Sequence, residues 1–509
     1  MAALRAGGRD EAHRMGLNAS DFLVILAYLA AVTVFGLRFR GKERTLRGYF
    51  LASNSIPWWA ISISIVAAET STLTIISLPG LAYAQNFRIL QLALGYILGR
   101  IAVATLFIPH YFRGQLVTAY ELIARRFGER LRWMTAGLFL VTRAAAEGIR
   151  VFAVALVVRI ALGPLLGGMS DLGRDVAAVG VVTLLTLVYT FEGGMRAVVW
   201  TDVVQLSLYV AGAVVAIFAI VGALPGGWHQ VLAVAVPAGR FRVFDLSFHL
   251  TTTYSLWAGV IGGAFLTTAS HGTDQLIVQR LLAARNERQS KIALVTSGFA
   301  VAMLFTLFLL IGALLFVYYN EFPPATAFTK TDMLFPTFIA TRMPHLIAGL
   351  LISAILAAAM SNLSAALNSL SSITVVDFYA RLFPQAGEDR RVRISRAATL
   401  SWAMVLFFLA LVSRRGGTVI EMGLSIASVA YGSLLGVFLL GVLTRSASER
   451  GAMIGMLCGL GFNVYCWGFT RIPFTWYVVF GSAVTFVIGY AGSRVLVWTR
   501  RPEKEVSTS

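Results

Sequence analysis

Residues 57–80 read PWWAISISIVAAETSTLTIISLPG, an apolar stretch with a polar centre. Its flanks are apolar enough to lie in a bilayer, but Glu69 and several hydroxyl residues occupy its middle, and the pair Pro79-Gly80 ends it. An acid and several hydroxyls at the centre of a membrane span are costly unless they line a wet cavity or a binding site. The stretch therefore predicts an interrupted helix built around a site, which is typical of a transporter.

The composition of the whole chain is that of a membrane protein. Of its 509 residues 58% are hydrophobic and 13% are charged, whereas soluble domains contain about 25% charged residues. Apolar stretches of roughly 20 residues, long enough to cross a bilayer, recur from end to end. We expect an all-α polytopic membrane protein with one transmembrane domain over residues 20–498, a disordered extracytoplasmic segment 1–19 and a short cytoplasmic tail 499–509.

About thirteen membrane spans are predicted. They begin near residues 20, 57, 89, 131, 173, 196, 252, 291, 346, 394, 418, 449 and 473. The loops after the odd-numbered spans carry clusters of basic residues, which mark the cytoplasmic side. The clusters are Arg38 to Arg47, Arg113 to Arg132, Arg196, Arg280 to Lys291, Arg381 to Arg396, Arg445 and Arg450, and Arg494 to Lys504. This pattern predicts an N-terminus outside and a C-terminus in the cytoplasm, in the plasma (inner) membrane. It also accounts for the net charge of +18 without a nucleic-acid partner.

A second interrupted span is predicted over residues 256–279, which read LWAGVIGGAFLTTASHGTDQLIVQ. Glycines and hydroxyl residues break this stretch as they break the first, and the two lie five spans apart. Corresponding interrupted spans in two halves are the sequence signal of an inverted-repeat transporter with its site at mid-membrane. The five-helix repeats would cover approximately residues 57–224 and 252–440.

The ninth predicted span carries a polar stripe. Ser361, Ser364, Asn368, Ser371 and Ser372 recur at a spacing that places them on one face of a helix. Such a stripe is either a packing seam with interhelical hydrogen bonds or part of a site for a hard cation such as Na⁺, which oxygen ligands suit.

The chain resembles the sodium/solute symporter family over nearly its whole length. The matching stretches are Gly48 to Ala52 with Pro57 to Trp59, Tyr189 to Gly194 with Ala197 to Gln205, Gly272 to Gln275 with Val278 to Arg280, and Met360-Ser361 through Leu367 to Ser369 and on to Asp377. The resemblance implies a five-plus-five fold of the leucine-transporter type and alternating access driven by a Na⁺ gradient.

The resemblance also implies a sodium site. Its ligands, carried over by position, are Ala67, Thr70, Ala358, Ser361 and Asn362. Asn362 departs from the family, which usually has Ser or Thr there, although an amide oxygen can still bind Na⁺. Some members have a second sodium site with an acid matching Asp202 and a hydroxyl where this chain has Ala365. We therefore predict one sodium ion at most.

Charged residues of the second and fourth spans are candidates for binding the solute. Glu69 is a solute contact, a proton carrier, an anionic partner of the sodium site, or half of a structural ion pair with Arg143 or Arg150. Arg143, Glu147 and Arg150 share one helix face. In a sialic acid-transporting relative an arginine of this helix holds a carboxylate, but Arg143 and Glu147 can also pair along the helix. A net positive cavity would favour an anionic or zwitterionic solute.

Further solute contacts are expected from polar residues that match cavity positions of the family or lie near them in the sequence. These are Ser71, Thr74, Gln91, Thr267, Ser270 and His271. His271 is also consistent with a packed or capping residue. The set is poor in the groups that bind sugars, which disfavours a simple hexose.

We therefore expect a secondary active transporter, which imports a small anionic or zwitterionic organic solute together with Na⁺. The alternative is a proton-coupled symporter of the same fold with Glu69 as the proton carrier. An enzyme is disfavoured, because no nucleophile–base pair, zinc-ligand spacing or phosphate loop is found. The expected partners are the solute, Na⁺ and the lipid bilayer, with no obligate protein partner evident.

Overall fold

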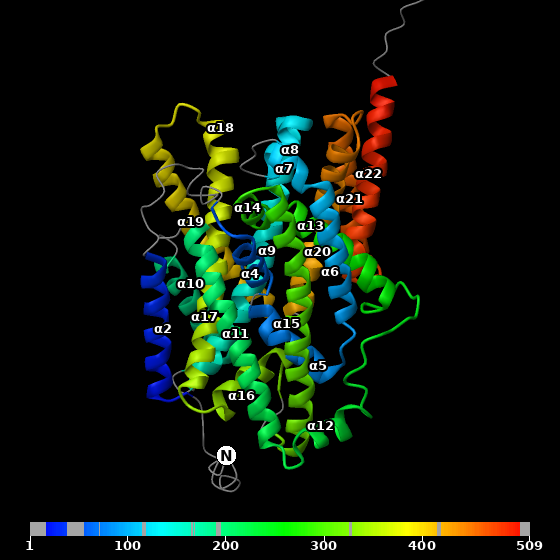
Figure 1. The fold of residues 1–509 in the computed structure, drawn as a ribbon. Helices are drawn as coiled ribbons and strands as arrows, with labels where there is room; N and C mark the ends of the chain where they lie inside the picture. The colour runs from blue at the N-terminus through cyan, green and yellow to red at the C-terminus, as the bar shows by residue number, and fades with distance from the viewer. Residues whose placement is uncertain are drawn as a thin grey trace, which may run out of the picture.

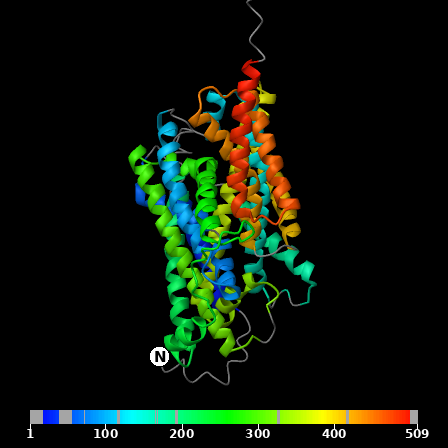
Figure 2. The ribbon, with the colours of Figure 1, turned by 90° about the vertical axis from the view of Figure 1, so that its right-hand side faces the viewer.

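The computed structural model describes residues 17–37, 55–70, 72–113, 119–163, 166, 168–189, 195–324, 328–414 and 419–498. These residues are almost wholly helical, and the one β pairing among them is an isolated bridge between Ile56 and Ala284. The long helices run along a common direction, with α2 at one edge of the bundle and α21 and α22 at the other (Figure 1). Seen from the side, α21 and α22 lie against each other along their length (Figure 2). The all-α prediction is confirmed for this part of the chain.

The first half of the chain forms the elements up to the second interrupted span. They are α2 (Ala19–Leu37), α4 (Trp58–Glu69), α5 (Thr72–Ala84), α6 (Leu90–Leu106), α7 (Ile108–Arg113), α8 (Ala119–Arg126), α9 (Glu129–Ala161), α10 (Asp171–Tyr189), α11 (Met195–Ala223), α12 (Gly227–Ala235), η3 (Ala258–Gly262), α13 (Gly263–Gly272) and α14 (Gln275–Leu282).

The second half follows with a set of long helices joined by short elements. They are α15 (Glu287–Glu321), η4 (Thr331–Met333), α16 (Leu334–Arg342), α17 (Ile347–Ile373), η5 (Thr374–Tyr379), α18 (Ala380–Leu382), α19 (Glu388–Ser413), α20 (Val419–Leu443), α21 (Glu449–Phe469) and α22 (Phe474–Trp498).

Eight of the described helices are long and apolar enough to cross a membrane, and the pair α4–α5 makes a ninth if it is one bent span. A helix also begins near each of the predicted span starts, α2, α9 and α10 included. The total of thirteen spans stays a prediction.

The first interrupted span is broken where the sequence turns polar. Helix α4 ends at Glu69, α5 begins at Thr72, and the two are bent by 62°. Thr70 leaves helical geometry at φ −82° and ψ 70°. The carbonyls in the last turn of a helix have no partner within that helix, so the end of α4 places hydrogen-bond acceptors at the break.

The second interrupted span is broken between Gly272 and Gln275. Helix α13 ends at Gly272, and Asp274 caps α14 by accepting a hydrogen bond from the Leu276 amide at 2.9 Å. Helix α13 packs closely on α6, since a Cβ at Gly99 would stand 2.4 Å from the Ala264 carbonyl oxygen. This close approach brings the end of α13 to the break between α4 and α5.

Candidate functional site

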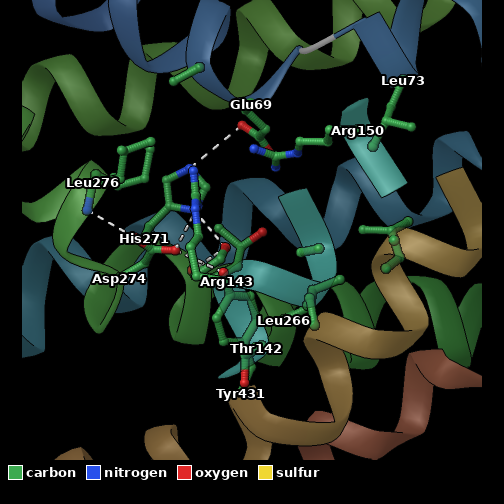
Figure 3. Close-up of a pocket in the computed structure, with 18 of the residues that line it drawn as sticks. Glu69, Leu73, Thr142, Arg143, Arg150, Leu266, His271, Asp274, Leu276 and Tyr431 are labelled. Atoms are coloured by element: carbon green, nitrogen blue, oxygen red, sulfur yellow. Dashed lines mark hydrogen bonds and ion pairs between the residues drawn. The ribbon is translucent and has the colours of Figure 1, made fainter. Parts of the chain in front are cut away.

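A cavity of about 140 Å³ lies where the two interrupted spans meet. Its walls come from α4, α5, α6, α9, α13, α14, α15 and α20 (Figure 3). The lining residues are Ala68, Glu69, Leu73, Thr74, Tyr96, Phe139, Thr142, Arg143, Ala146, Arg150, Leu266, Thr267, Ser270, His271, Asp274, Leu276, Ile277, Phe305, Ile420, Gly423, Leu424, Ala427, Tyr431 and Leu434. We call it the solute cavity.

Glu69 forms a buried ion pair at one wall of the solute cavity. Arg100 of α6 donates from Nη2 to Glu69 Oε2, and His271 Nε2 lies 3.5 Å from the same oxygen. Arg100 has no exposed side-chain surface, and its Nε donates to the Ser297 hydroxyl at 3.0 Å. The structural partner of Glu69 is therefore Arg100, and the prediction of Arg143 or Arg150 in this role is wrong.

A second charged cluster lies on α9 and at the start of α14. Glu147 Oε1 accepts a hydrogen bond from Arg150 Nη1 at 2.8 Å and forms an ion pair with Arg143, whose Nη2 lies 2.8 Å away. Asp274 Oδ2 lies 3.3 Å from Arg143 Nη1 and accepts from the Tyr431 hydroxyl at 2.9 Å. The pairing of Arg143 and Glu147 along the helix is confirmed.

The charges around the solute cavity are balanced. Glu69 offsets Arg100, and Glu147 and Asp274 offset Arg143 and Arg150. No excess of positive charge is found among these described groups.

Two charged side chains present most of the charge to the cavity. The Arg150 side chain is 25% exposed and that of Glu69 is 18% exposed, whereas Arg143, Glu147 and Asp274 are each exposed by 7% or less. Each of these two side chains is paired with a buried group of opposite charge, Glu69 with Arg100 and Arg150 with Glu147.

The structure brings seven of the ten predicted solute residues to the cavity wall. They are Glu69, Thr74, Arg143, Arg150, Thr267, Ser270 and His271. Glu147 lies behind Arg143 and Arg150, and Ser71 falls outside the described residues. Gln91 is not among the lining residues. Its amide donates to the Tyr254 carbonyl at 2.9 Å and accepts from the Asp245 amide at 3.1 Å.

The predicted sodium ligands come from the break in the first interrupted span and from α17. Ala67 and Thr70 lie at the carboxyl end of α4, and Asn362 is buried with 7% of its surface exposed. Ala358 and Ser361 belong to α17, but their side chains lie outside the described part of the structure. The sodium set stays a prediction.

Asp202 of α11, which matches the acid of the second sodium site, is paired within the protein. Its Oδ2 accepts from the Ser64 hydroxyl at 2.5 Å and lies 3.2 Å from Arg280 Nη2. The prediction that the second site is incomplete, made from Ala365, is compatible with this pairing but is not tested by it.

Sequence reasoning missed several residues of the site. Arg100 had a detectable signal, because an arginine inside an apolar span needs a partner. Asp274 lies in one of the family stretches. No sequence pattern marks Tyr96 and Tyr431 as cavity residues, because a tyrosine inside a membrane span cannot be told from a packed aromatic residue until its neighbours are known.

Comparison with known proteins decides the family. The model of the sodium:solute symporter family matches residues 49–459. The chain belongs to the sodium:solute symporter family. It is a membrane transporter coupled to sodium and not an enzyme, so these expectations are confirmed.

The similar proteins include symporters of sialic acid. The chain is 26% identical to the sodium/sialic acid symporter NanT of Aliivibrio fischeri, over 92% of each chain. It is 28% identical to the sodium/sialic acid symporter SiaT of Proteus mirabilis, over 92% of this chain and 94% of the relative. A solved structure of a Na⁺-coupled sialic acid symporter, in a substrate-bound outward-open state, matches with a TM-score of 0.82 and 27% identity over 94% of this chain and 98% of that one.

Proposed function

We propose that this symporter imports a small organic carboxylate together with sodium and that Arg150 binds the carboxylate. The observation that carries the proposal is the exposure of Arg150, whose side chain faces the cavity while Nη1 is held by Glu147. A guanidinium has five donors in a planar fork and suits a carboxylate. Arg143 is less suited, because Glu147 and Asp274 both hold it and little of it reaches the cavity.

The opposite charge of Glu69 narrows the class of solute. Its carboxylate faces the same cavity and offers acceptor oxygens to an amino or hydroxyl group. Leu73, Phe139, Phe305 and Leu424 add an apolar wall. The cavity thus fits an anion or a zwitterion with hydrogen-bond donors at one end. Sialic acid, named for two similar proteins, is a carboxylic acid rich in hydroxyl groups and lies within this class.

Uptake into proteoliposomes tests the proposal. Radiolabelled N-acetylneuraminate, pyruvate and proline would be offered with an inward sodium gradient or with choline in its place. We expect sodium-driven uptake of at least one of them, reduced at least tenfold by Arg150→Gln and less by Arg150→Lys, which keeps the charge but loses the fork.

Arg159→Gln is the matched control, because Arg159 lies on the same helix and pairs with Asp171 and Asp175 away from the cavity. The proposal fails if Arg150→Gln transports as well as the control does.

Coupling to a proton, with Glu69 as its carrier, is opposed by the Arg100 pair. Protonating Glu69 would leave the guanidinium of Arg100 buried beside a neutral group, which is strongly unfavourable. We expect uptake to need sodium at every pH, and a pH gradient alone to drive none. Glu69→Gln also breaks the pair with Arg100, so we expect the folded variant to bind solute more weakly and any uptake that it keeps to stay sodium-dependent. Uptake driven by a pH gradient alone would instead support the proton carrier.

Import also requires an orientation and a moving core. We place the N-terminus outside and the C-terminus in the cytoplasm of the plasma membrane, from the distribution of basic loops. The two repeats, over residues 57–224 and 252–440, would rock around the solute cavity. Protease digestion of a C-terminal tag in right-side-out vesicles checks the orientation, because an inner tag is protected there.

A further inference from the structure

The chain between α12 and α13 carries a row of apolar side chains that face away from the protein. Residues 242–249 form no helix, and partly buried and exposed side chains alternate from Phe241 to Phe248. Such alternation is typical of an extended chain that lies on a surface. The exposed row includes four large apolar side chains, exposed by 44% to 68%, namely Phe244, Leu246, Phe248 and Leu250. We call residues 241–250 the outer segment.

The centre of the outer segment turns its polar side chains toward the protein. Asp245 Oδ2 lies 3.0 Å from Arg88 Nη1, and Asp245 Oδ1 accepts from the Ser247 hydroxyl at 2.6 Å. The Asp245 amide donates to Gln91 Oε1 at 3.1 Å. Over residues 244–248 every outward side chain is thus apolar and every inward one is polar. A segment whose outer face meets water has the opposite pattern, with apolar side chains inward and polar ones outward.

The outer segment lies beside the ends of membrane spans. The Phe248 ring packs edge-on against that of Trp257, directly before η3 and α13, with 6.0 Å between the ring centroids. The Tyr254 ring lies 6.4 Å from that of Phe474, where the span of α22 begins. In Figure 1 this part of the chain swings out to the edge of the molecule, on the side of α6 and α22. Tryptophan and tyrosine gather where spans meet the lipid headgroups, so the apolar row lies at that level.

We propose that the outer segment is an interfacial anchor, whose outward apolar side chains insert among the lipids of the outer leaflet. Such an element binds by burying apolar side chains at the boundary between headgroups and acyl chains. Arg242, exposed at the start of the row, suits the phosphate of a headgroup. At this depth water still reaches free backbone groups, so a non-helical segment is tolerated there, although not in the hydrocarbon core. The choice of the outer leaflet follows from the orientation proposed above.

The anchor also holds the outer end of α6. The Phe87 amide donates to the Arg242 carbonyl at 3.1 Å just before this helix begins. Gln91, in the first turn of the helix, accepts from the Asp245 amide. The same helix carries the buried Arg100. Lipid bound by the outer segment therefore fixes the outer end of the helix that supports the first interrupted span.

Spin labels placed at single positions test the anchor without any solute. Each label would be attached to one introduced cysteine, in full-length protein whose two native cysteines, Cys458 and Cys466, are replaced by alanine. The protein would be reconstituted in vesicles of phosphatidylethanolamine and phosphatidylglycerol. Collisions of the label would be measured with oxygen, which concentrates in lipid, and with a nickel chelate, which stays in water. We expect oxygen collisions to dominate for the three outward positions, Phe244→Cys, Leu246→Cys and Phe248→Cys.

Helix α15 supplies both reference positions. Met303 lies in the middle of this span and is 74% exposed, so Met303→Cys reports lipid. Asn320 is exposed at the carboxyl end of the helix, which with 35 residues is longer than the bilayer is thick, so Asn320→Cys reports water. The anchor is overturned if the outward labels of the outer segment behave like Asn320→Cys. It is also overturned if they collide with neither reagent, because protein, such as a second copy of this chain, then covers the row.

A pair of substitutions at Phe248 then tests whether apolar character holds the segment in lipid. With the label on Leu246→Cys, Phe248→Asp should raise nickel collisions toward the value of Asn320→Cys, because a carboxylate is unfavourable among acyl chains. Phe248→Leu is the matched control, since it keeps an apolar side chain, and should leave the collisions unchanged. Equal nickel collisions in the two variants would contradict the anchor. If Phe248→Asp does not fold, the accessibility of the three outward positions decides alone.

Discussion

The residue that best explains the polar centre of the first interrupted span is Arg100. It reaches from α6 with no exposed surface and neutralises Glu69, while Ser297 and the Tyr96 carbonyl accept from its other donors. A buried ion pair of this kind holds two segments in register, here the break after α4 and the neighbouring helix α6. Glu69 is therefore both a structural anchor and a wall of the solute cavity.

Removing one member of the Glu69–Arg100 pair is expected to lower the stability of the folded protein more than removing both members does. Arg100→Met leaves the Glu69 carboxylate without its cation, and breaking a buried pair in this way costs about 3–5 kcal/mol. The double variant Arg100→Met, Glu69→Gln should recover part of the loss, because neither charge remains. Thermal melting in detergent measures the stability of the single and the double variant. A double variant less stable than Arg100→Met alone would contradict this account of the pair.

Among the elements, α17 is held at its amino end by the first helix. The Asp21 side chain of α2 accepts from the Leu346 amide at 2.7 Å and from the Gly349 amide at 3.3 Å, and lies 2.7 Å from His345 Nδ1. These contacts satisfy amides that the start of a helix leaves free. Helix α2, which lies outside the predicted repeats, thus fixes the helix that carries Asn362.

Loss of this cap should lower the stability of the protein without changing the solute cavity. Asp21→Ala removes an acceptor from the start of α17, and such losses cost about 0.5–2 kcal/mol. Ser20→Ala is the neighbouring control, since the Ser20 hydroxyl donates to the Asn18 side chain at 2.6 Å, two residues away in the same segment. Melting temperatures compare the two. Equal melting temperatures would mean that Asp21 does not hold α17.

The structural elements and their contacts could be predicted from the sequence to different degrees. The first interrupted span was predicted correctly, because Glu69 and its hydroxyl neighbours violate what lipid tolerates. The pairing of Arg143 with Glu147 followed from spacing along one helix. The partner of Glu69 could not be predicted from spacing, because Arg100 lies on another helix and spacing carries no information about contacts between helices. Gln91 was misread as cavity-facing for the same reason: its amide holds the segment around Asp245 and Tyr254.

At the scale of the whole molecule, fold and family were predictable because many weak signals agree. The recurring apolar stretches, the alternating basic loops and the two interrupted spans all fit one architecture, and a solved symporter structure matches it with a TM-score of 0.82. The balance of charge in the cavity was not predictable. It depends on Asp274 and Arg100 meeting α9 and α4 from elsewhere in the bundle, so counting the arginines of α9 suggested an excess that the assembled site lacks.

The carboxylate of Glu147 pairs with two arginines, and this sharing has a consequence for how the transporter can evolve. A substitution that removes Arg150 leaves Glu147 with Arg143 alone and shifts the balance of charge at the cavity by one unit. Lineages that change to an uncharged solute should therefore lose Arg150 together with a neighbouring acid, in paired rather than single substitutions.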